Sequence, residues 1–466
     1  MEDQKDVKIR ELEAKIHALE AEIKTLKKLV AELTARLSKN SSNSSKPPSS
    51  DIVSPPKQGD KNRKKTKRKQ GAQKGHTRNL RVDFTSDQID SVRTSTLSHC
   101  PDCGGKLLAS ATPDKILRQI EWIEKPFRVT EYRRPSYCCA DCGKSCRTPL
   151  PEGIFPGLFG SKLKALTAWA KGVGRLSFKT LQRFLSAMFQ VDVSTGYIAD
   201  VVREVSDSLA VPYAELSATV RESKHVPCDE TGLKENGKKR WVWVARSNDS
   251  TIFKIAPSRG SQVLTELLSD DFSGTISCDF YGAYQKFAKT TRSKLQFCWA
   301  HLIREFRAVA ESAERKTSNF GKRIVRKIQA MFSTIHRRGE LAESAWSRQM
   351  NEHKKRLMKS LHWGVPDDKD AQNLVERLTR CETDYFRFID EPIPPTNNPA
   401  EQTIRKVAIA RKISQGTRSD WGNRWLERFW SVETSCEQRG QNLLDFITQI
   451  FANYLKGAKA SASGIS

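Results

Sequence analysis

The sequence predicts a multidomain α+β protein, and three observations support this class. Apolar residues repeat in heptads over the first segment, two close pairs of cysteines follow, and strand-like apolar runs begin near residue 225. Segments that differ in hydrophobic period indicate separate structural parts. With 466 residues, 37% of them hydrophobic, the chain is long enough for two or three domains with cores of their own.

The charge balance indicates a polyanionic partner. Lysine and arginine number 80 against 54 aspartates and glutamates, a net charge of +26, and such a surplus favours nucleic acid because neutralised phosphates release counterions. No stretch approaches the roughly 20 apolar residues that cross a bilayer, and the opening MEDQKD lacks the features of a secretory signal. We expect an intracellular protein that binds double-stranded DNA and no membrane.

Residues 1–37 carry an unbroken apolar seam. Its members alternate steps of three and four residues: Ile9, Leu12, Ile16, Leu19, Ile23, Leu26, Val30, Leu33 and Leu37. Ile or Val at four of the five a positions, with Leu at every d position, favours a parallel two-stranded coiled coil. The alternative is one amphipathic helix packed on the protein's own core. We expect the coil, and therefore a homodimer or a larger assembly.

A linker and a basic arm follow the seam. Residues 38–56 are rich in Ser, Asn and Pro, a composition typical of linkers. Residues 57–82 include eleven Lys or Arg and one Asp. A solvated run without a ligand is the alternative for such a segment, but its charge density favours contact with DNA phosphates. The predicted DNA-binding residues of the arm are Arg63, Lys64, Lys65, Lys67, Arg68 and Lys69.

Residues 95–150 are predicted to bind zinc. The stretches CPDCGG and CCADCGKSC each place two thiolates on a tight turn that the following glycine permits, and two such turns complete a tetrahedral site. Reduced cysteines without a metal are the alternative. Cys138 and Cys146 leave the fourth ligand open. The predicted zinc ligands are Cys100, Cys103, Cys139 and Cys142.

Residues 161–222 have helical periodicity. Three stretches, KLKALTAWAKGVGRL, FKTLQRFLSAMF and TGYIADVVREVSDSL, each present one apolar face. The short QVDVS joins the last two, so they could form a helix-turn-helix that reads a DNA groove or simply a packed helix pair. Both interpretations stand.

Residues 223–302 are predicted to form the catalytic core. HVPCDETGL, KRWVWVARS and TIFKIAPS read as three antiparallel strands, and Asn236-Gly237 is a favoured type I′ hairpin turn between the first two. A helical stretch near SQVLTELLS then leads to two short apolar runs, in TISCDFYGAY and KLQFCWAH. A three-stranded meander followed by helix, strand, helix and strand is the order of a ribonuclease H-like core.

Two acids are expected to meet in this core. Asp229 is expected to end the first strand and Asp279 the fourth, and those strands would be neighbours in the predicted topology. Paired carboxylates repel each other unless cations neutralise them, so the pair predicts a site for divalent ions. Two ions about 4 Å apart can activate a water or a 3′-hydroxyl and stabilise the leaving oxygen of a phosphodiester.

Glu401 has two interpretations. Asn398 is a favoured N-cap residue and Pro399 fits the next position, so Glu401 could be the third-position acid of a capping box. Alternatively, it is the third metal-binding acid, placed on a helix that continues with basic residues suited to a DNA backbone. We favour the second interpretation because Asp229 and Asp279 are already present. The basic residues predicted to bind DNA are Arg405, Lys406, Arg411 and Lys412.

Several stretches resemble the insertion-sequence-66 family of bacterial transposases. CDET, DFYGAY, CWAHLIREF and NNPAEQTIRKVAIARK resemble its signature blocks, and KNSSNSSKPPSSD, GAQKGH and the cysteine pairs resemble its amino-terminal half. The resemblance implies a DDE-type transposase that cleaves the ends of an insertion sequence and joins them to target DNA, using magnesium or alternatively manganese. It also implies that Asp229, Asp279 and Glu401 bind these ions, and that the protein works on the nucleoid in the bacterial cytoplasm.

The remaining segments complete the prediction. Residues 303–394 read as a helical insertion in the core, and residues 395–460 as the catalytic helix and carboxy-terminal helices. Cys298 and His301 could hold a metal, although packed, hydrogen-bonded residues are the favoured interpretation. Core packing is likewise favoured over base stacking for an aromatic stripe. The stripe consists of Trp421, Trp425, Phe429 and Trp430.

Two other functions fit much of the same pattern. A non-catalytic DNA-binding regulator would use the coil, the arm and the zinc module but would not need the three acids. A metal-dependent nuclease would need the acids but would stop after hydrolysis. Joined DNA products distinguish a transposase from both.

Overall fold

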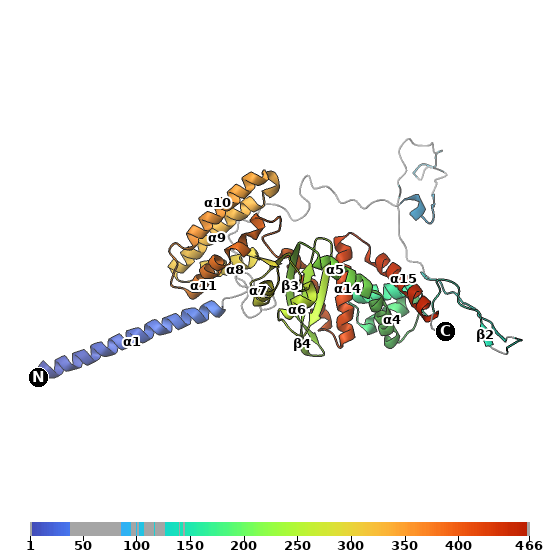
Figure 1. The fold of residues 1–466 in the computed structure, drawn as a ribbon, viewed down its shortest axis with the longest axis horizontal. Coiled ribbons are helices and arrows are strands. Elements are labelled where there is room, and N and C mark those ends of the chain that lie inside the picture. The colour runs from blue at the N-terminus through green and yellow to red at the C-terminus, as the bar shows by residue number, and fades with distance from the viewer. Residues whose placement is uncertain are drawn as a thin grey trace. The chain divides into compact units, whose positions relative to one another are not determined.

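The computed structural model describes most of the chain (Figure 1). The described residues are 2–37, 85–94, 99, 102–106, 116, 126–138, 140–142 and 145–463. The linker, the whole basic arm, and the cysteines Cys100 and Cys139 lie outside them. The chain divides into two compact units, residues 57–128 and the remainder of the chain.

The first helix, α1 (Glu2–Leu37), carries the heptad seam. The seam side chains that the structure describes are about half exposed, from 48% for Leu33 to 60% for Val30. An apolar stripe of this length is therefore uncovered in the single chain. Among the described residues, no helix combines the length and apolar composition that crossing a membrane requires.

A five-stranded mixed sheet forms the centre of the larger unit. Its strands are β3 (His225–Glu235), β4 (Lys238–Arg246), β5 (Thr251–Ala256), β6 (Thr275–Cys278) and β7 (Lys294–Phe297), and they lie in the order β5-β4-β3-β6-β7. The first three are antiparallel neighbours, whereas β6 is parallel to β3 and β7 is parallel to β6. Helices α6 (Gln262–Leu268) and α7 (Gly282–Thr290) make the two connections to the parallel strands.

The predicted meander and its first turn are confirmed. Asn236 has a φ of 46° and Gly237 a φ of 81°, so both central residues of the β3–β4 turn are left-handed, as type I′ geometry requires. Strand β5 then pairs with β4, with Ala256 opposite Trp241 and Thr251 opposite Arg246.

Four helices precede the sheet: α2 (Ser161–Gly172), α3 (Phe178–Phe189), α4 (Thr195–Ser208) and α5 (Ala210–Arg221). The hydroxyl of Ser177 accepts a hydrogen bond from the Thr180 amide and caps α3, and the hydroxyl of Ser194 caps α4 in the same way. The apolar faces of these two helices meet in a small separate cluster that includes Leu181. Helix α4 also contacts α2 and α14 (Asp420–Gln438), so it is integrated into the core.

Helices also fill the segment between β7 and the helix that carries Glu401. They are α8 (Trp299–Ala310), α9 (Arg315–Ile335), α10 (Glu343–Leu361), α11 (Lys369–Arg380) and α12 (Glu382–Phe386). The first of them begins inside CWAH, four residues before the predicted start of the insertion at residue 303. In Figure 1 the sheet lies between helices α8 to α11 and the helices α4, α14 and α15.

Helix α14 (Asp420–Gln438) closes the β5 edge of the sheet. Backbone amides at alternate positions of β5 donate to side chains spaced four residues apart on α14: Thr251 to Ser435, Phe253 to Ser431 and Ile255 to Glu427. Two strand residues span about 6.8 Å and four helical residues about 6 Å, so the two repeats match. Three side chains of the aromatic stripe are buried, Trp425, Phe429 and Trp430, and the fourth, Trp421, is partly buried and packs against the same core, which confirms core packing.

Candidate active site

The strand register brings Asp229 and Asp279 together. Strand β3 pairs with β6 up to Pro227 and Ser277, and two residues further along each chain the same register reaches the two aspartates. Asp279 directly follows β6, as predicted. Asp229 does not end its strand, because β3 continues to Glu235 alongside β4. The aspartate instead lies just beyond the point where β3 stops pairing with β6.

Both aspartates resist ionisation. Burial, followed by the charges of Glu230 and Asp279, raises the pKa of Asp229 well above its usual range. Burial and the charge of Glu230 raise the pKa of Asp279 to about 6, although a backbone amide and Arg259 oppose the shift. The charge of Glu401 contributes to the raised pKa of each aspartate. With Glu230, four carboxyl groups therefore contribute negative charge to one region.

The aspartates have few compensating partners. Asp229 accepts a hydrogen bond from the Glu230 amide at 2.9 Å, and Asp279 accepts one from the Tyr281 amide at 3.0 Å. Among the ion pairs found in the described residues, none includes either aspartate. The chemistry of the donor set, anionic oxygen on neighbouring strands, fits a hard divalent cation.

Glu401 lies in the first turn of α13 (Asn398–Ser414) and points toward α8. One carboxylate oxygen, Oε1, is 3.8 Å from the Cys298 sulfur and 3.5 Å from His301 Nδ1. The other oxygen is 3.6 Å from a guanidinium nitrogen of Arg304. Glu401 and the two aspartates are not all within 4.8 Å of one another, whereas Glu401, Cys298 and His301 are.

The capping box, which was the alternative interpretation of Glu401, does not form. Helix α13 begins at Asn398, so Asn397 is the N-cap residue, and no side chain caps the helix. The Asn397 amide group instead donates to the Cys228 carbonyl at 2.7 Å, while its backbone amide donates to the Cys298 sulfur at 3.2 Å. These two bonds tie the start of α13 to the residue before Asp229 and to the end of β7. The carboxylate of Glu401 is thereby left available for other contacts.

Beside the two aspartates lies a third acid, the buried Glu230, whose carboxylate does have side-chain partners. Glu230 follows Asp229 in β3, and its side chain is 1% exposed. Arg259 donates to Glu230 Oε1 through two nitrogens, at 2.9 and 2.6 Å, and the Tyr284 hydroxyl donates to Oε2. The Arg259 guanidinium lies 3.9 Å from the centre of the Tyr281 ring. Sequence reasoning missed this group; the alternation of faces along β3 was the available signal.

The zinc-module cysteines that the structure describes have suitable local geometry. Cys103 and Cys142 are exposed thiols. Gly104 follows Cys103 with a φ of 70°, the left-handed conformation that a cysteine turn needs. Cys142 lies in the turn between β1 (Ser136–Cys138) and β2 (Ser145–Arg147). Thiolates on tight turns suit zinc.

Comparison with known proteins decides the family. The family described as "Transposase IS66 family" matches residues 156–424, more than half of the chain. The chain belongs to the IS66 transposase family. A second match, "zinc-finger binding domain of transposase IS66", covers residues 98–143, and a family of unknown function, DUF6444, matches residues 2–81. The resemblance drawn from the sequence is confirmed, and the two IS66 matches support a DNA-binding transposase with structural zinc.

Two curated relatives come from Sinorhizobium fredii. The protein y4qI, described as uncharacterized, is 24% identical over 388 residues, which cover 77% of this chain and 71% of the relative. The protein y4hP, also described as uncharacterized, is 24% identical over 352 residues, covering 67% of this chain and 62% of the relative.

The basic residues of α13 in this IS66 transposase divide into two groups. Lys406 pairs with Glu437 at 2.6 Å, and Arg411 donates to the Gly232 carbonyl, so both connect α13 to neighbouring elements. Arg405 and Lys412 are exposed. The exposed pair is the better placed to meet a DNA phosphate.

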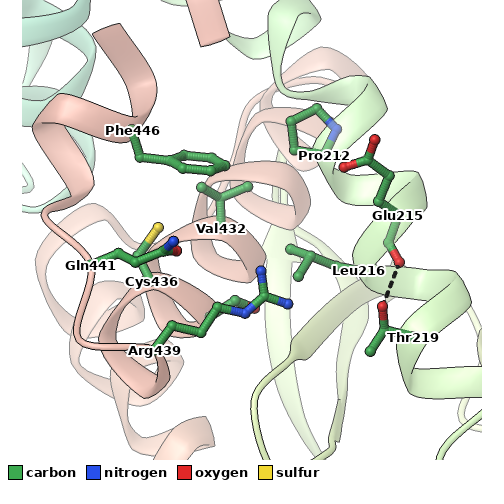
Figure 2. Close-up of a pocket in the computed structure, with 10 residues that line it drawn as sticks. Pro212, Glu215, Leu216, Thr219, Val432, Cys436, Arg439, Gln441 and Phe446 are labelled. Atoms are coloured by element: carbon green, nitrogen blue, oxygen red, sulfur yellow. Dashed lines mark hydrogen bonds between the residues drawn. The ribbon is translucent and has the colours of Figure 1, made fainter. Parts of the chain in front are cut away.

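A separate pocket lies between α5, α14 and the start of α15 (Leu443–Ser463), as Figure 2 shows. Leu216, Val432 and Phe446 form its apolar lining, and Glu215 and Arg439 add charge. Its lining includes none of the predicted site residues. We assign this pocket no part in the transposase chemistry.

Proposed function

We propose that this chain is a DDE-type transposase that cuts the ends of its element and joins them to target DNA. Asp229, Asp279 and Glu401 would hold two magnesium ions, with manganese as the alternative. The observation that carries the proposal is the in-register pair of aspartates, whose pKa values are raised first by burial and then by the charges of neighbouring carboxylates. Two aspartates held together without an ion-pair partner of their own favour the binding of metal cations.

The residues would divide the chemistry between them. When bound, the ions supply activation of the attacking oxygen and stabilisation of the leaving oxygen. Asp229 and Asp279 keep their oxygens on adjacent strands, and Asn397 holds the start of α13 beside them. Water would attack the phosphodiester at the element end, and the freed 3′-hydroxyl would attack target DNA. Glu401 has to turn from His301 and Arg304 toward the aspartates to take part.

We also propose that residues 223–302, with the catalytic helix in 395–460, form a ribonuclease H-like core. The strand order β5-β4-β3-β6-β7, with the meander first and two parallel strands after it, supports this. The helices of residues 303–394 would then be an insertion between β7 and α13. The region 161–222 keeps both interpretations, helix-turn-helix or packing unit.

The remaining parts would hold DNA and a second copy of the chain. The half-exposed seam of α1 supports a parallel coiled coil and hence a homodimer or larger assembly. The arm, residues 57–82, and the zinc module, residues 95–150, would grip DNA. Arg405 and Lys412 would hold a backbone phosphate near the acids, and the protein would act on the bacterial nucleoid.

A strand-transfer assay tests the function. Purified protein, magnesium and DNA with the element's ends are incubated with a target plasmid, and joined products are counted. Losing one metal-binding acid removes several kcal/mol of transition-state stabilisation, so Asp279→Ala should lower joining by on the order of 10³-fold. The exposed Asp271 offers a matched control, and Asp271→Ala should join normally.

Each outcome separates the candidate functions. Undiminished joining by Asp279→Ala would refute the assigned acids. Cut ends without joined products from the wild type would indicate the nuclease. Binding of the ends without any cleavage would indicate the regulator.

A further inference from the structure

A thiol, an imidazole and a carboxylate meet beside the proposed magnesium centre. The ligand atoms of Cys298, His301 and Glu401 all lie within 4.8 Å of one another. Cys298 lies between β7 and α8, His301 lies in the first turn of α8, and Glu401 lies in the first turn of α13. Within the described part of the chain, no other set of three His, Cys, Asp or Glu side chains lies this close.

The spacing fits a tetrahedral ion. Zinc bonds to sulfur at about 2.3 Å and to nitrogen or oxygen at about 2.0–2.2 Å, so on a tetrahedral ion a sulfur and an oxygen are about 3.6 Å apart and a nitrogen and an oxygen about 3.4 Å. The Cys298 sulfur is 3.8 Å from Glu401 Oε1, and His301 Nδ1 is 3.5 Å from the same oxygen. Two sides of the ligand triangle are therefore within about 0.2 Å of the required length.

The site also contains a buried nitrogen, His301 Nδ1, that makes no hydrogen bond. Glu401 Oε1 lies 3.5 Å from it without forming one. Leaving a buried polar atom without a hydrogen bond is unfavourable, and a bond to a metal ion would remove that penalty. Cys298 is 2% exposed, and the Asn397 amide fixes its sulfur. Arg304 contacts the other oxygen of Glu401, so Oε1 is the oxygen that faces the thiol and the imidazole.

We propose that Cys298, His301 and Glu401 form a second zinc site, distinct from the zinc finger. The ligand set favours zinc or a similar thiophilic ion over magnesium, because magnesium prefers oxygen ligands alone. Three protein ligands leave the fourth tetrahedral position open to water. Binding releases the thiol proton of Cys298 to solvent.

The site has a consequence for the activity, and this part rests on the proposed function. Glu401 belongs both to the zinc site and to the proposed magnesium centre. A zinc ion would hold its carboxylate toward α8 and keep it from the aspartates. Zinc at this site is therefore an inhibitor of magnesium-dependent joining.

Cobalt binding by the full chain tests the site directly. One equivalent of zinc is added first, because four thiolates hold zinc more tightly than one and the finger fills first. Cobalt is then titrated, and the absorption band of sulfur-to-cobalt charge transfer is followed. The wild type should bind one cobalt per chain with this band.

Two variants identify the ligands. Cys298→Ser should remove the band, and His301→Gln should weaken cobalt binding at least about tenfold, since even outer-shell changes cost 10- to 100-fold. Cys436→Ser, which removes another buried thiol, should leave the band intact. Circular dichroism checks the fold of each variant, and His301→Gln decides the matter if Cys298→Ser unfolds. The site is refuted if the wild type shows no band or if both ligand variants bind like the wild type.

Inhibition by zinc tests the consequence separately. Joining is measured with magnesium at rising free zinc, and each protein is compared with its own zinc-free rate. The half-inhibiting zinc concentration should rise at least about tenfold in Cys298→Ser and not in Cys436→Ser; equal values would overturn the inhibitory role. A wild type that binds cobalt but joins no DNA would refute the proposed function and leave the zinc site standing.

Discussion

Asp229 and Glu230 are adjacent in β3, but the described part of the protein provides side-chain hydrogen-bond donors to Glu230 and none to Asp229. Glu230 is buried and receives hydrogen bonds from Arg259 and Tyr284, so its carboxylate has partners within the fold. Asp229 receives one backbone hydrogen bond and faces the charges of other carboxylates. A buried acid is tolerated in a fold when protein groups pair with it, whereas a buried acid without such partners destabilises the fold unless a cation binds. The comparison separates a structural acid from the proposed metal-binding one.

The largest expected effect on stability comes from replacing Glu230. Glu230→Ala leaves Arg259 and the buried Tyr284 hydroxyl without their acceptor, so it should lower the free energy of unfolding by about 3–5 kcal/mol. Urea unfolding followed by tryptophan fluorescence measures the loss. The control is Glu352→Ala, which breaks an exposed pair with Arg356 and should change stability by less than about 1 kcal/mol. Equal effects from both variants would contradict the distinction.

Replacing Asp279, which has no ion-pair partner among the described residues, should have the opposite effect on stability. Without magnesium, Asp279→Asn removes a carboxylate whose pKa is raised to about 6, so it should stabilise the fold by on the order of 2–3 kcal/mol at pH 7. Added magnesium should raise the unfolding midpoint of the wild type and not that of Asp279→Asn. A destabilised Asp279→Asn variant would mean that Asp279 is a structural acid like Glu230.

The pH dependence of stability gives a second measure of the same difference. The pKa of Asp279 is about 6 in the folded state against an ordinary 3.8, so the folded protein holds this proton more tightly. The stabilisation that protonated Asp279 gives to the folded state is fully present below about pH 4 and is lost as the pH rises through about 6. In the absence of magnesium, the wild type should lose about 2–3 kcal/mol relative to Asp279→Asn over this window. Parallel pH profiles would rule out the raised pKa.

The sequence predicted the parts of this region that local signals determine. The turn at Asn236-Gly237, the three strands of the meander and the two later strands follow from residue preference and period. The proximity of Asp229 and Asp279 followed from strand topology, because parallel neighbours present equivalent positions together. The family was predicted from short motifs and confirmed over residues 156–424.

Long-range contacts explain what the sequence did not predict. Arg259 and Glu230 are 29 residues apart in the chain, and no periodic pattern in the sequence predicts that they pair. The capping interpretation of Glu401 was sound locally, but the Asn397 side chain is used by the Cys228 carbonyl, 169 residues away. Cys298 and His301 were interpreted as packed residues because two ligands do not make a site, and only folding brings Glu401 to them.

Removing an uncharged hydrogen-bond acceptor should have the smallest effect on stability. The Ser431 hydroxyl accepts a hydrogen bond from the Phe253 amide at 2.9 Å, and both residues are fully buried. Ser431→Ala leaves that amide unpaired at the edge of the sheet, so it should lower the free energy of unfolding by about 1–3 kcal/mol. Ser333→Ala, on an exposed face of α9, should change it by less than about 0.5 kcal/mol. Because no charge is stranded, the loss from Ser431→Ala should stay below that from Glu230→Ala; a larger loss would mean that the α14 contact, more than ion pairing, determines the stability of this sheet.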